Sequence, residues 1–246
     1  MGGTPMLWSR AMRAILALLI VISPMPALAQ SCPAPLAGAH RLVLVTALDM
    51  ASPNATLERF SRSSPQAPWK ADGGPVTALV GHNGMGWANA FRAYAKDGEP
   101  IKIDGDKKAP AGFYRIGRPF GIQPSRLRGY LRLAEGDVCV DDPKSRAYNT
   151  ITTRAKVGAK VHGENMWRVP DYAHGLVVDY PTDARDRAGS CIFIHAWLPG
   201  KTGTAGCVAV RTPVVLKLQD FAQGGAALAV LPKQALDRFK SCLPER

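Results

Sequence analysis

The chain has 246 residues, of which 46% are hydrophobic and 20% are charged, with 24 glycines and 20 prolines. This length and balance fit one or two globular domains and exclude collagen-like, coiled-coil, multi-span membrane and mainly disordered proteins. The 31 Lys and Arg residues outnumber the 19 Asp and Glu residues and leave a net charge of +12. That charge indicates an acidic partner or surface without identifying it.

The first 29 residues have the pattern of a secretory signal peptide. An apolar run over 14–22 follows two arginines, and Ala27-Leu28-Ala29 supplies the small residues that a signal peptidase needs. An uncleaved membrane anchor is the alternative, but two prolines interrupt the run before Ala29. We therefore expect cleavage after Ala29 and export of residues 30–246, with no later membrane span.

Strand patterns dominate the exported part of the chain. Turn residues recur about every eight to twelve positions, and the segments between them are short and apolar. Several alternate poorly, as strands buried on both faces do. The predicted strands cover residues 41–48, 76–80, 112–116, 175–180, 190–195, 207–210 and 226–230.

Helices are predicted late in the chain. Thr212 and Pro213 form a good helix start, apolar residues then recur at helical spacing, and a pair of glycines can end the helix. A second short helix is predicted over 234–241. Segment 51–74 is polar and is predicted to be a mobile loop. We expect one mostly β domain, a sandwich or barrel with a few short, mainly C-terminal helices.

Five cysteines remain after signal cleavage, so at least one stays unpaired if the others form disulfides. The chain has no C-x-x-C motif and no Cys and His cluster at metal-ligand spacing. A structural zinc site, another metal site or a thioredoxin-type redox pair is therefore not expected, and no cofactor is predicted.

One His and one Cys flank a turn-rich loop. His195 ends a predicted strand, Cys207 begins the next, and Gly206 precedes the cysteine. If these strands are neighbours, an imidazole at one strand end can take the proton of a thiol at the other. Gly206 permits close approach of a substrate, and the amides of this turn can bind an oxyanion. Alone, this pair is a weak pattern.

Further motifs in the same order strengthen the pattern of His195 and Cys207. The segment from His195 through Thr204-Ala205-Gly206-Cys207 looks like the catalytic segment of the L,D-transpeptidase (YkuD-like) family, which has a His, a variable loop and then Ser/Thr-x-Gly-Cys. Segment 104–116 resembles the family's DG-K-TP-G-F-I stretch. Segments 141–149, 166–168 and 189–190 are similar to an exported branch of that family. The match spans about 76–210.

This resemblance implies a mostly β cysteine enzyme of the bacterial cell wall. Members attack a peptidoglycan stem peptide at the diaminopimelate carbonyl before a terminal D-alanine, form a thioester and pass the acyl group to an amine. By position, Cys207 is the nucleophile, His195 the general base and acid, and Gly206 part of the oxyanion site, while Thr204 matches the Ser/Thr. Thr204 is a candidate substrate-binding residue. Further candidates, each with a core or turn role as the alternative, are Trp197, Tyr148, Asn149, Trp167 and Arg168.

The chain departs from the family at Ala205, which replaces a second His, and at Val208 and Ala209, where an Arg or Asn is common. Three functions stay open: a transpeptidase, a carboxypeptidase or endopeptidase that uses water, and a non-catalytic wall-binding domain. We expect a periplasmic protein whose positive charge suits the anionic wall. Nucleic-acid binding is not expected, because no DNA- or RNA-binding module pattern is present.

Two further residue roles remain open in the sequence. The group that orients His195 is a backbone carbonyl, Asp179 or His174. If Cys207 is catalytic, the other four cysteines allow three pairings. We favour Cys139 with Cys191 and Cys32 with Cys242. Strand periodicity places Cys191 on the same face as His195, so a Cys191–Cys207 bridge that silences the enzyme is the alternative.

Overall fold

A computed structural model of the chain describes residues 1–3 and 32–245. The expected signal-peptide cleavage after Ala29 lies outside the described residues. Residues 32–245 belong to one compact unit. In the described part of the chain, no helix is long and apolar enough to cross a membrane.

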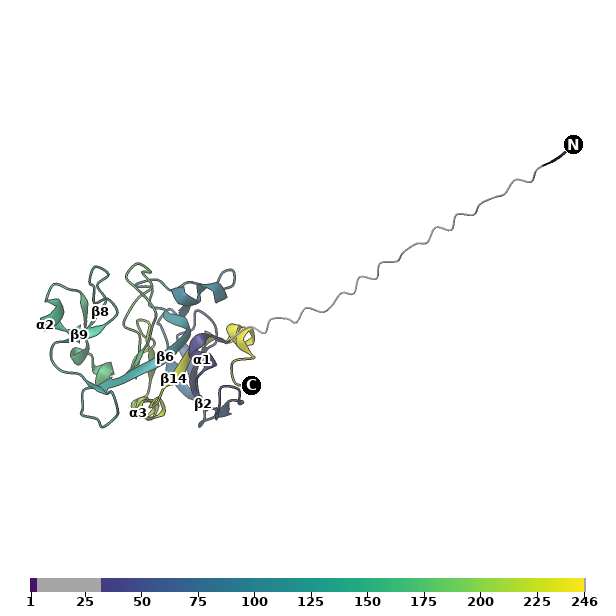
Figure 1. Ribbon diagram of the computed structural model, residues 1–246. Coiled ribbons are helices and arrows are strands. Elements are labelled where there is room, and N and C mark those ends of the chain that lie inside the picture. The colour runs from purple at the N-terminus through teal and green to yellow at the C-terminus, as the bar shows by residue number, and fades with distance from the viewer. Residues whose placement is uncertain (4–31, 246) are drawn as a thin grey trace. The chain divides into compact units, whose positions relative to one another are not determined.

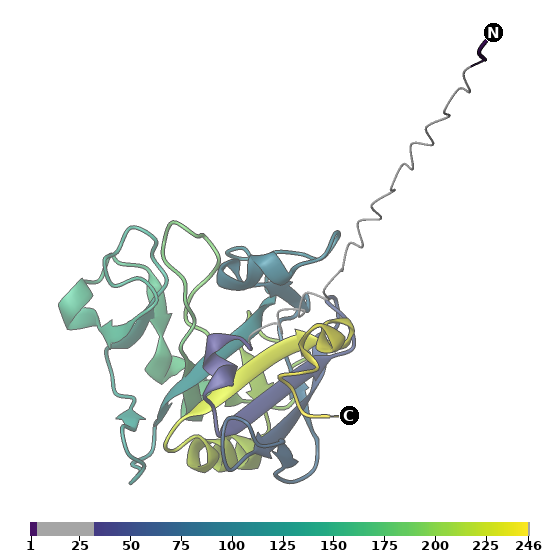
Figure 2. The ribbon, with the colours of Figure 1, turned by 45° about the vertical axis from the view of Figure 1, so that its right-hand side comes forward.

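Eight strands close into a barrel of mixed direction, in which the two ends of the strand order pair with each other. Neighbours in the barrel are β1 (Arg41–Ala47), β14 (Ala226–Pro232), β6 (Ala109–Gly121), β11 (His174–Val178), β12 (Phe193–Ala196), β13 (Val208–Val210), β4 (Val76–Leu79) and β2 (Asn54–Ser61), which pairs back to β1. The β1–β14 and β12–β13 pairs are parallel. Figure 2 shows β14, in yellow, between β1 and the long β6. Closure leaves these strands without free edges.

A small three-stranded sheet lies beside the barrel. Its strands are ordered β10 (Gly163–Asn165), β8 (Asp137–Val140) and β9 (Ile151–Thr153). Figure 1 shows β8 and β9 grouped with helix α2 (Arg154–Val157) at one side of the compact unit. The 3-10 helices η2 (Met166–Arg168) and η3 (Pro170–Ala173) lead from β10 back to β11. Residues 137–173 thus form a cover next to β11 and β12.

A second apolar cluster joins this cover to the barrel. The rings of Phe120, Tyr172 and Phe193 make mutual edge-on contacts with centroids 5.3–5.8 Å apart. Met166 and Cys207 are buried in the same cluster. Such aromatic pairs add about 0.5–1.5 kcal/mol each beyond burial of their area. The cluster therefore fixes the cover over the strand that carries His195.

Short helices occur along the whole described chain, so the expectation that they are mainly C-terminal is wrong. The early ones are α1 (Ala34–Ala37) and the 3-10 helix η1 (Asn89–Tyr94). The predicted helix at Thr212 is present as α3 (Thr212–Phe221), and the predicted helix over 234–241 is the 3-10 helix η4 (Lys233–Phe239). Gln219 of α3 donates to two backbone oxygens of β6 and β11 at 2.9 Å, which fastens α3 to the barrel.

All seven predicted strands are present with shifted ends, and further strands were not predicted. Segment 51–74 is not a loop, because it contains β2 and β3 (Lys70–Ala71). In β2 the apolar side chains of Ala55, Leu57 and Phe60 are buried, and the intervening polar residues hide the pattern. Two other short strands, β5 (Met85–Trp87) and β7 (Leu131–Arg132), pair with β6.

The favoured disulfide pairing is confirmed. Cys32 bonds Cys242 with their Cα atoms 5.5 Å apart, and Cys139 bonds Cys191 with a Cα separation of 6.0 Å. Cys207 is the free cysteine and is buried. The Cys191–Cys207 bridge is therefore excluded. One reason is local: Cys191 has a positive φ of 58° and lies before β12, so it does not share the strand periodicity of His195.

A buried ion pair holds the turn at the start of segment 104–116. Lys102 Nζ lies 2.7 Å from Asp106 Oδ1, and the two side chains are 3% and 9% exposed. Two backbone N–H groups of this turn also donate to the Asp106 carboxylate. Asp106→Ala would leave a buried ammonium without its partner.

We expect Asp106→Ala to lower the free energy of unfolding by about 3–5 kcal/mol, as measured by urea denaturation. Asp183→Ala is the matched control, because Asp183 pairs with Arg185 at the surface and its loss should have no measurable effect. An equal effect of the two variants would contradict the structural role of the buried pair.

Candidate active site

Cys207 and His195 line one cavity of about 250 Å³. Two other predicted site residues, Trp197 and Thr204, line it as well. The cavity lies where β12 and β13 run side by side beneath the cover.

The pairing of β12 with β13 brings the two candidate catalytic residues together. Ile194 pairs with Val208 in parallel register, so Phe193 of β12 lies next to Cys207, the residue that directly precedes β13. The Phe193 N–H donates to Cys207 Sγ at 3.4 Å. Because side chains alternate along a strand, His195 projects to the same face as Phe193. The strands β12 and β13 are thus neighbours, and His195 and Cys207 line the same cavity.

A backbone carbonyl orients His195. Its Nδ1 lies 2.9 Å from the Ala196 oxygen, and a carbonyl only accepts, so the neutral ring carries its proton on Nδ1. The lone pair of Nε2 is then available as a base. Asp179 lines other cavities, and His174 pairs with Gly121 in the barrel, so neither takes this role.

The cavity favours the neutral forms of both residues. Burial lowers the pKa of His195 below its usual value, an effect that the Ala196 carbonyl and Asp171 partly oppose. Burial raises the pKa of the Cys207 thiol to about 12, and the charges of Glu164 and Asp171 add to that rise. The resting pair is thus a thiol beside an imidazole rather than a thiolate–imidazolium pair. The proton must move when the sulfur attacks.

This resting state predicts a steep pH dependence for simple alkylation of Cys207. With a thiol pKa of about 12, the thiolate fraction and the iodoacetamide rate should rise about tenfold per pH unit from pH 7 to 10. A mass-spectrometric rate series measures this directly. A small thiol such as 2-mercaptoethanol, run as control, should level off in the upper part of this range. A plateau for Cys207 near neutral pH would instead indicate a preformed ion pair.

Thr204 holds the turn before Cys207. Its Oγ1 accepts from the Gly206 N–H at 3.1 Å and donates to the Cys207 carbonyl at 2.7 Å. Gly206 has φ of 150°, and a Cβ there would lie 3.1 Å from the Lys108 oxygen. In this structure the Gly206 N–H is bonded to Thr204, so Gly206 shapes the turn that precedes Cys207.

Four more residues of the cavity were not predicted from the sequence. The Tyr172 hydroxyl donates to Glu164 Oε2 at 2.7 Å, and the Tyr172 ring packs edge-on against His195 with centroids 5.4 Å apart. Asp171 Oδ2 lies 3.6 Å from Lys201 Nζ. Burial raises the pKa of Glu164. Three of these residues come from β10 and η3 in the cover, and no spacing relative to Cys207 marks them in the sequence.

The other predicted substrate-binding residues do not line this cavity. The Asn149 side chain accepts a hydrogen bond from the Cys191 N–H at 2.9 Å and donates one to a backbone oxygen at 3.0 Å. This is the turn-forming role considered as its alternative. Arg168 stacks on Trp167, 4.5 Å from its ring centroid. The hydroxyl of Tyr148 is buried, without a hydrogen-bond partner in the described residues.

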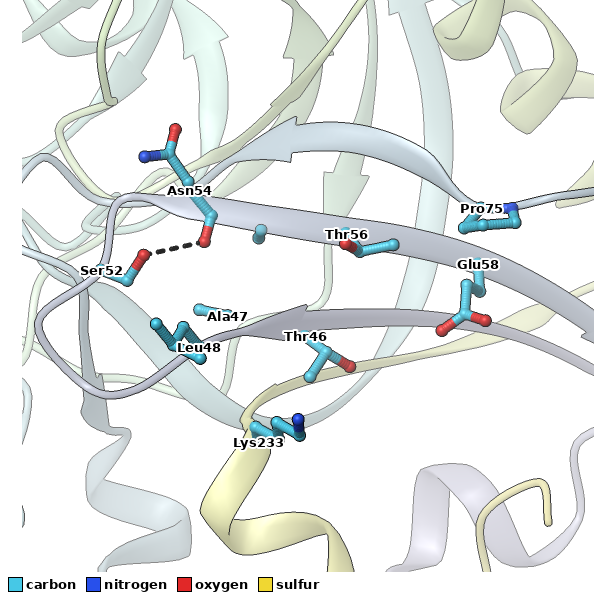
Figure 3. A pocket seen from close by; sticks show the side chains of 10 residues that line it. Thr46, Ala47, Leu48, Ser52, Asn54, Thr56, Glu58, Pro75 and Lys233 are labelled. Atoms are coloured by element: carbon cyan, nitrogen blue, oxygen red, sulfur yellow. Dashed lines mark hydrogen bonds between the residues drawn. The ribbon is translucent and has the colours of Figure 1, made fainter. Parts of the chain in front are cut away.

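A larger hollow lies elsewhere, on the outer side of the β1–β2 hairpin. Its volume is about 630 Å³, and Figure 3 shows Thr46, Thr56 and Glu58 on these strands with Lys233 nearby. The residues that line it in the described part of the chain include no cysteine or histidine. The smaller cavity is therefore the candidate active site, because a free thiol and an imidazole both line it. Within residues 1–3 and 32–245, no group of three or more potential metal ligands is found.

No protein-family model matches the chain, and no curated protein is significantly similar to it in sequence. The motifs and the cavity are the observations from which its function is inferred.

Proposed function

We propose that this protein is an L,D-transpeptidase of peptidoglycan, an exported enzyme that forms a thioester at Cys207. The observation that carries the proposal is a single cavity lined by the free, buried Cys207 and by His195, whose Nδ1 is bonded to a backbone carbonyl, at the residues that the collinear motifs mark as the catalytic pair. Two disulfides fit an oxidising compartment. The net charge of +12 favours encounter with the anionic wall.

Acylation starts when a stem-peptide carbonyl lies against Cys207. His195 Nε2 takes the thiol proton, and the sulfur attacks the carbonyl carbon. The backbone N–H of Cys207 is the candidate donor to the oxyanion. The C–N bond to the terminal D-alanine then breaks, and the imidazolium returns the proton to the leaving amine. The products are D-alanine and a thioester.

Deacylation uses the same base in the second half of the reaction. An amine of a second stem peptide attacks the thioester carbonyl while His195 takes its proton, and the thiol leaves with that proton. Water in place of the amine gives a carboxypeptidase or endopeptidase by the same steps. The product therefore identifies the acceptor, because an amine and water give different products.

Mass spectrometry of muropeptides tests the proposal. Sacculi with tetrapeptide stems are incubated with the protein and, in parallel, with Cys207→Ala. We expect a cross-linked product that depends on Cys207, whereas a product of added water would indicate the hydrolase. Identical muropeptides in both samples, with the thiol of Cys207 shown to be free, would contradict both enzymes and favour a wall-binding domain.

A further inference from the structure

One wall of the Cys207 cavity is acidic. Glu164 from β10 and Asp171 from η3 both line it, on the side formed by the cover. The Glu164 carboxylate is held by the Tyr172 hydroxyl through Oε2. Asp171 is 15% exposed at its side chain, so both acids belong to the cavity rather than to the open surface.

One cation balances the two acids of this wall only in part. Among the described residues that line the cavity, Lys201 is the one cationic side chain, and it is 56% exposed and 3.6 Å from Asp171 Oδ2. The other oxygen, Asp171 Oδ1, is buried with no hydrogen-bond partner in the described residues. Two acids that face one mostly exposed lysine leave this wall with a net negative charge, which a substrate cation would offset. His195 does not supply that charge, because it is neutral.

We propose that Glu164 and Asp171 form a subsite for a protonated primary amine of the substrate, next to the carbonyl that Cys207 attacks. The identity of the substrate rests on the proposed function, in which this amine is the side-chain ammonium of diaminopimelate. The charge selectivity itself rests on the cavity alone.

A bound ammonium would also change the nucleophile. The carboxylates of Glu164 and Asp171 oppose formation of a thiolate, in addition to the larger effect of burial on the pKa of Cys207. A cation between the two acids cancels part of this field, since opposite charges within about 4–6 Å favour each other's charged forms. A cationic substrate is therefore both bound and activated, while a neutral analogue of the same size gains neither effect.

Charge-matched thiol reagents test the subsite without any peptidoglycan reaction. We choose the 2-aminoethyl, ethyl and 2-sulfonatoethyl methanethiosulfonates, which differ in charge at similar length. In each case the Cys207 sulfur bonds the reagent's sulfenyl sulfur, methanesulfinate leaves, and a mixed disulfide forms. Cys207 is the free thiol of the chain, so the labelled site is unambiguous. Each rate constant is divided by that of the same reagent with 2-mercaptoethanol.

After this normalisation, the aminoethyl reagent should react about tenfold faster than the ethyl reagent, and the sulfonatoethyl reagent more slowly than both. The preference should fall towards unity in Glu164→Gln with Asp171→Asn. Asp220→Asn, which removes one negative charge from an exposed position of α3, should keep the preference for the aminoethyl reagent. Equal normalised rates in the unaltered protein, or a preference that survives in the double variant, would overturn the subsite.

A second variant keeps the test decisive if the double variant fails to fold. Lys201→Met removes the competing cation from a mostly exposed position. It should increase the preference for the aminoethyl reagent, and an unchanged or smaller preference would contradict the role of Asp171.

Stem peptides then connect the subsite to the substrate. Acetylation of the side-chain amine of diaminopimelate should lower kcat/KM about tenfold in the unaltered protein and have little effect in the double variant. A reagent preference without muropeptide products would leave the subsite standing and reject the proposed function. Muropeptide products without a reagent preference would support the proposed function and reject the subsite.

Discussion

His195→Gln should lower the rate of Cys207 acylation by about 10²- to 10⁴-fold, the range that a general base contributes. The glutamine keeps a donor for the Ala196 carbonyl, which Nδ1 of His195 bonds at 2.9 Å, but it has no basic nitrogen at the position of Nε2. Without that base, attack depends on the thiolate, which is scarce because the pKa of the thiol is raised to about 12. Single-turnover formation of the thioester, followed by mass spectrometry, measures the loss.

The pH profile separates loss of a base from loss of structure. Because burial lowers the pKa of His195 below 6.5, acylation by the unaltered protein should rise through a midpoint below pH 6.5 and then stay level to about pH 9. In His195→Gln this rise below pH 6.5 should disappear. The acylation rate should instead increase about tenfold per pH unit across the neutral range.

His40→Gln provides the matched control, since this histidine is exposed and does not line the cavity. Its rate and pH profile should equal those of the unaltered protein. If His195→Gln also kept the full acylation rate and the same rise of that rate below pH 6.5, His195 would not be the base.

The sequence predicts best where local pattern and tertiary role coincide. Both faces of β1 and β14 are buried, and both faces are therefore apolar. The sequence pattern alone predicts these two strands, without knowledge of their neighbours. β2 is misread as a loop because its outer face carries Asn54, Thr56 and Glu58. Its strand conformation depends on pairing with β1 and β4, which composition does not reveal.

The same distinction divides the candidate site. His195 and Cys207 are predictable because a short loop joins the two adjacent strands that carry them. Glu164 and Tyr172 reach the cavity only because the cover folds over β12, a contact between segments distant in sequence. Asn149 shows the opposite error, since a residue near a motif proves to hold the loop at Cys191. Proximity to a motif in sequence therefore does not establish contact with the substrate.

Removing the Cys139–Cys191 disulfide should damage stability and activity together. The bridge spans 52 residues of sequence, and in the loop-entropy model its loss costs about 4 kcal/mol. It also joins β8 of the cover to the residues just before β12, and the Cys191 carbonyl oxygen lies 3.7 Å from Cys207 Sγ. In Cys139→Ser with Cys191→Ser, we expect a lower urea midpoint and, in the fraction that remains folded, slower acylation of Cys207.

The other disulfide supplies a control of the same chemistry. Cys32–Cys242 spans 210 residues, so its removal should cost about 5 kcal/mol in the same model, somewhat more than removal of the shorter bridge. Neither of its cysteines lines the Cys207 cavity. Cys32→Ser with Cys242→Ser should therefore destabilise the protein while the folded fraction acylates at the normal rate. Equal acylation by the folded fractions of both double variants would mean that the cover does not need its covalent tie to position the cavity.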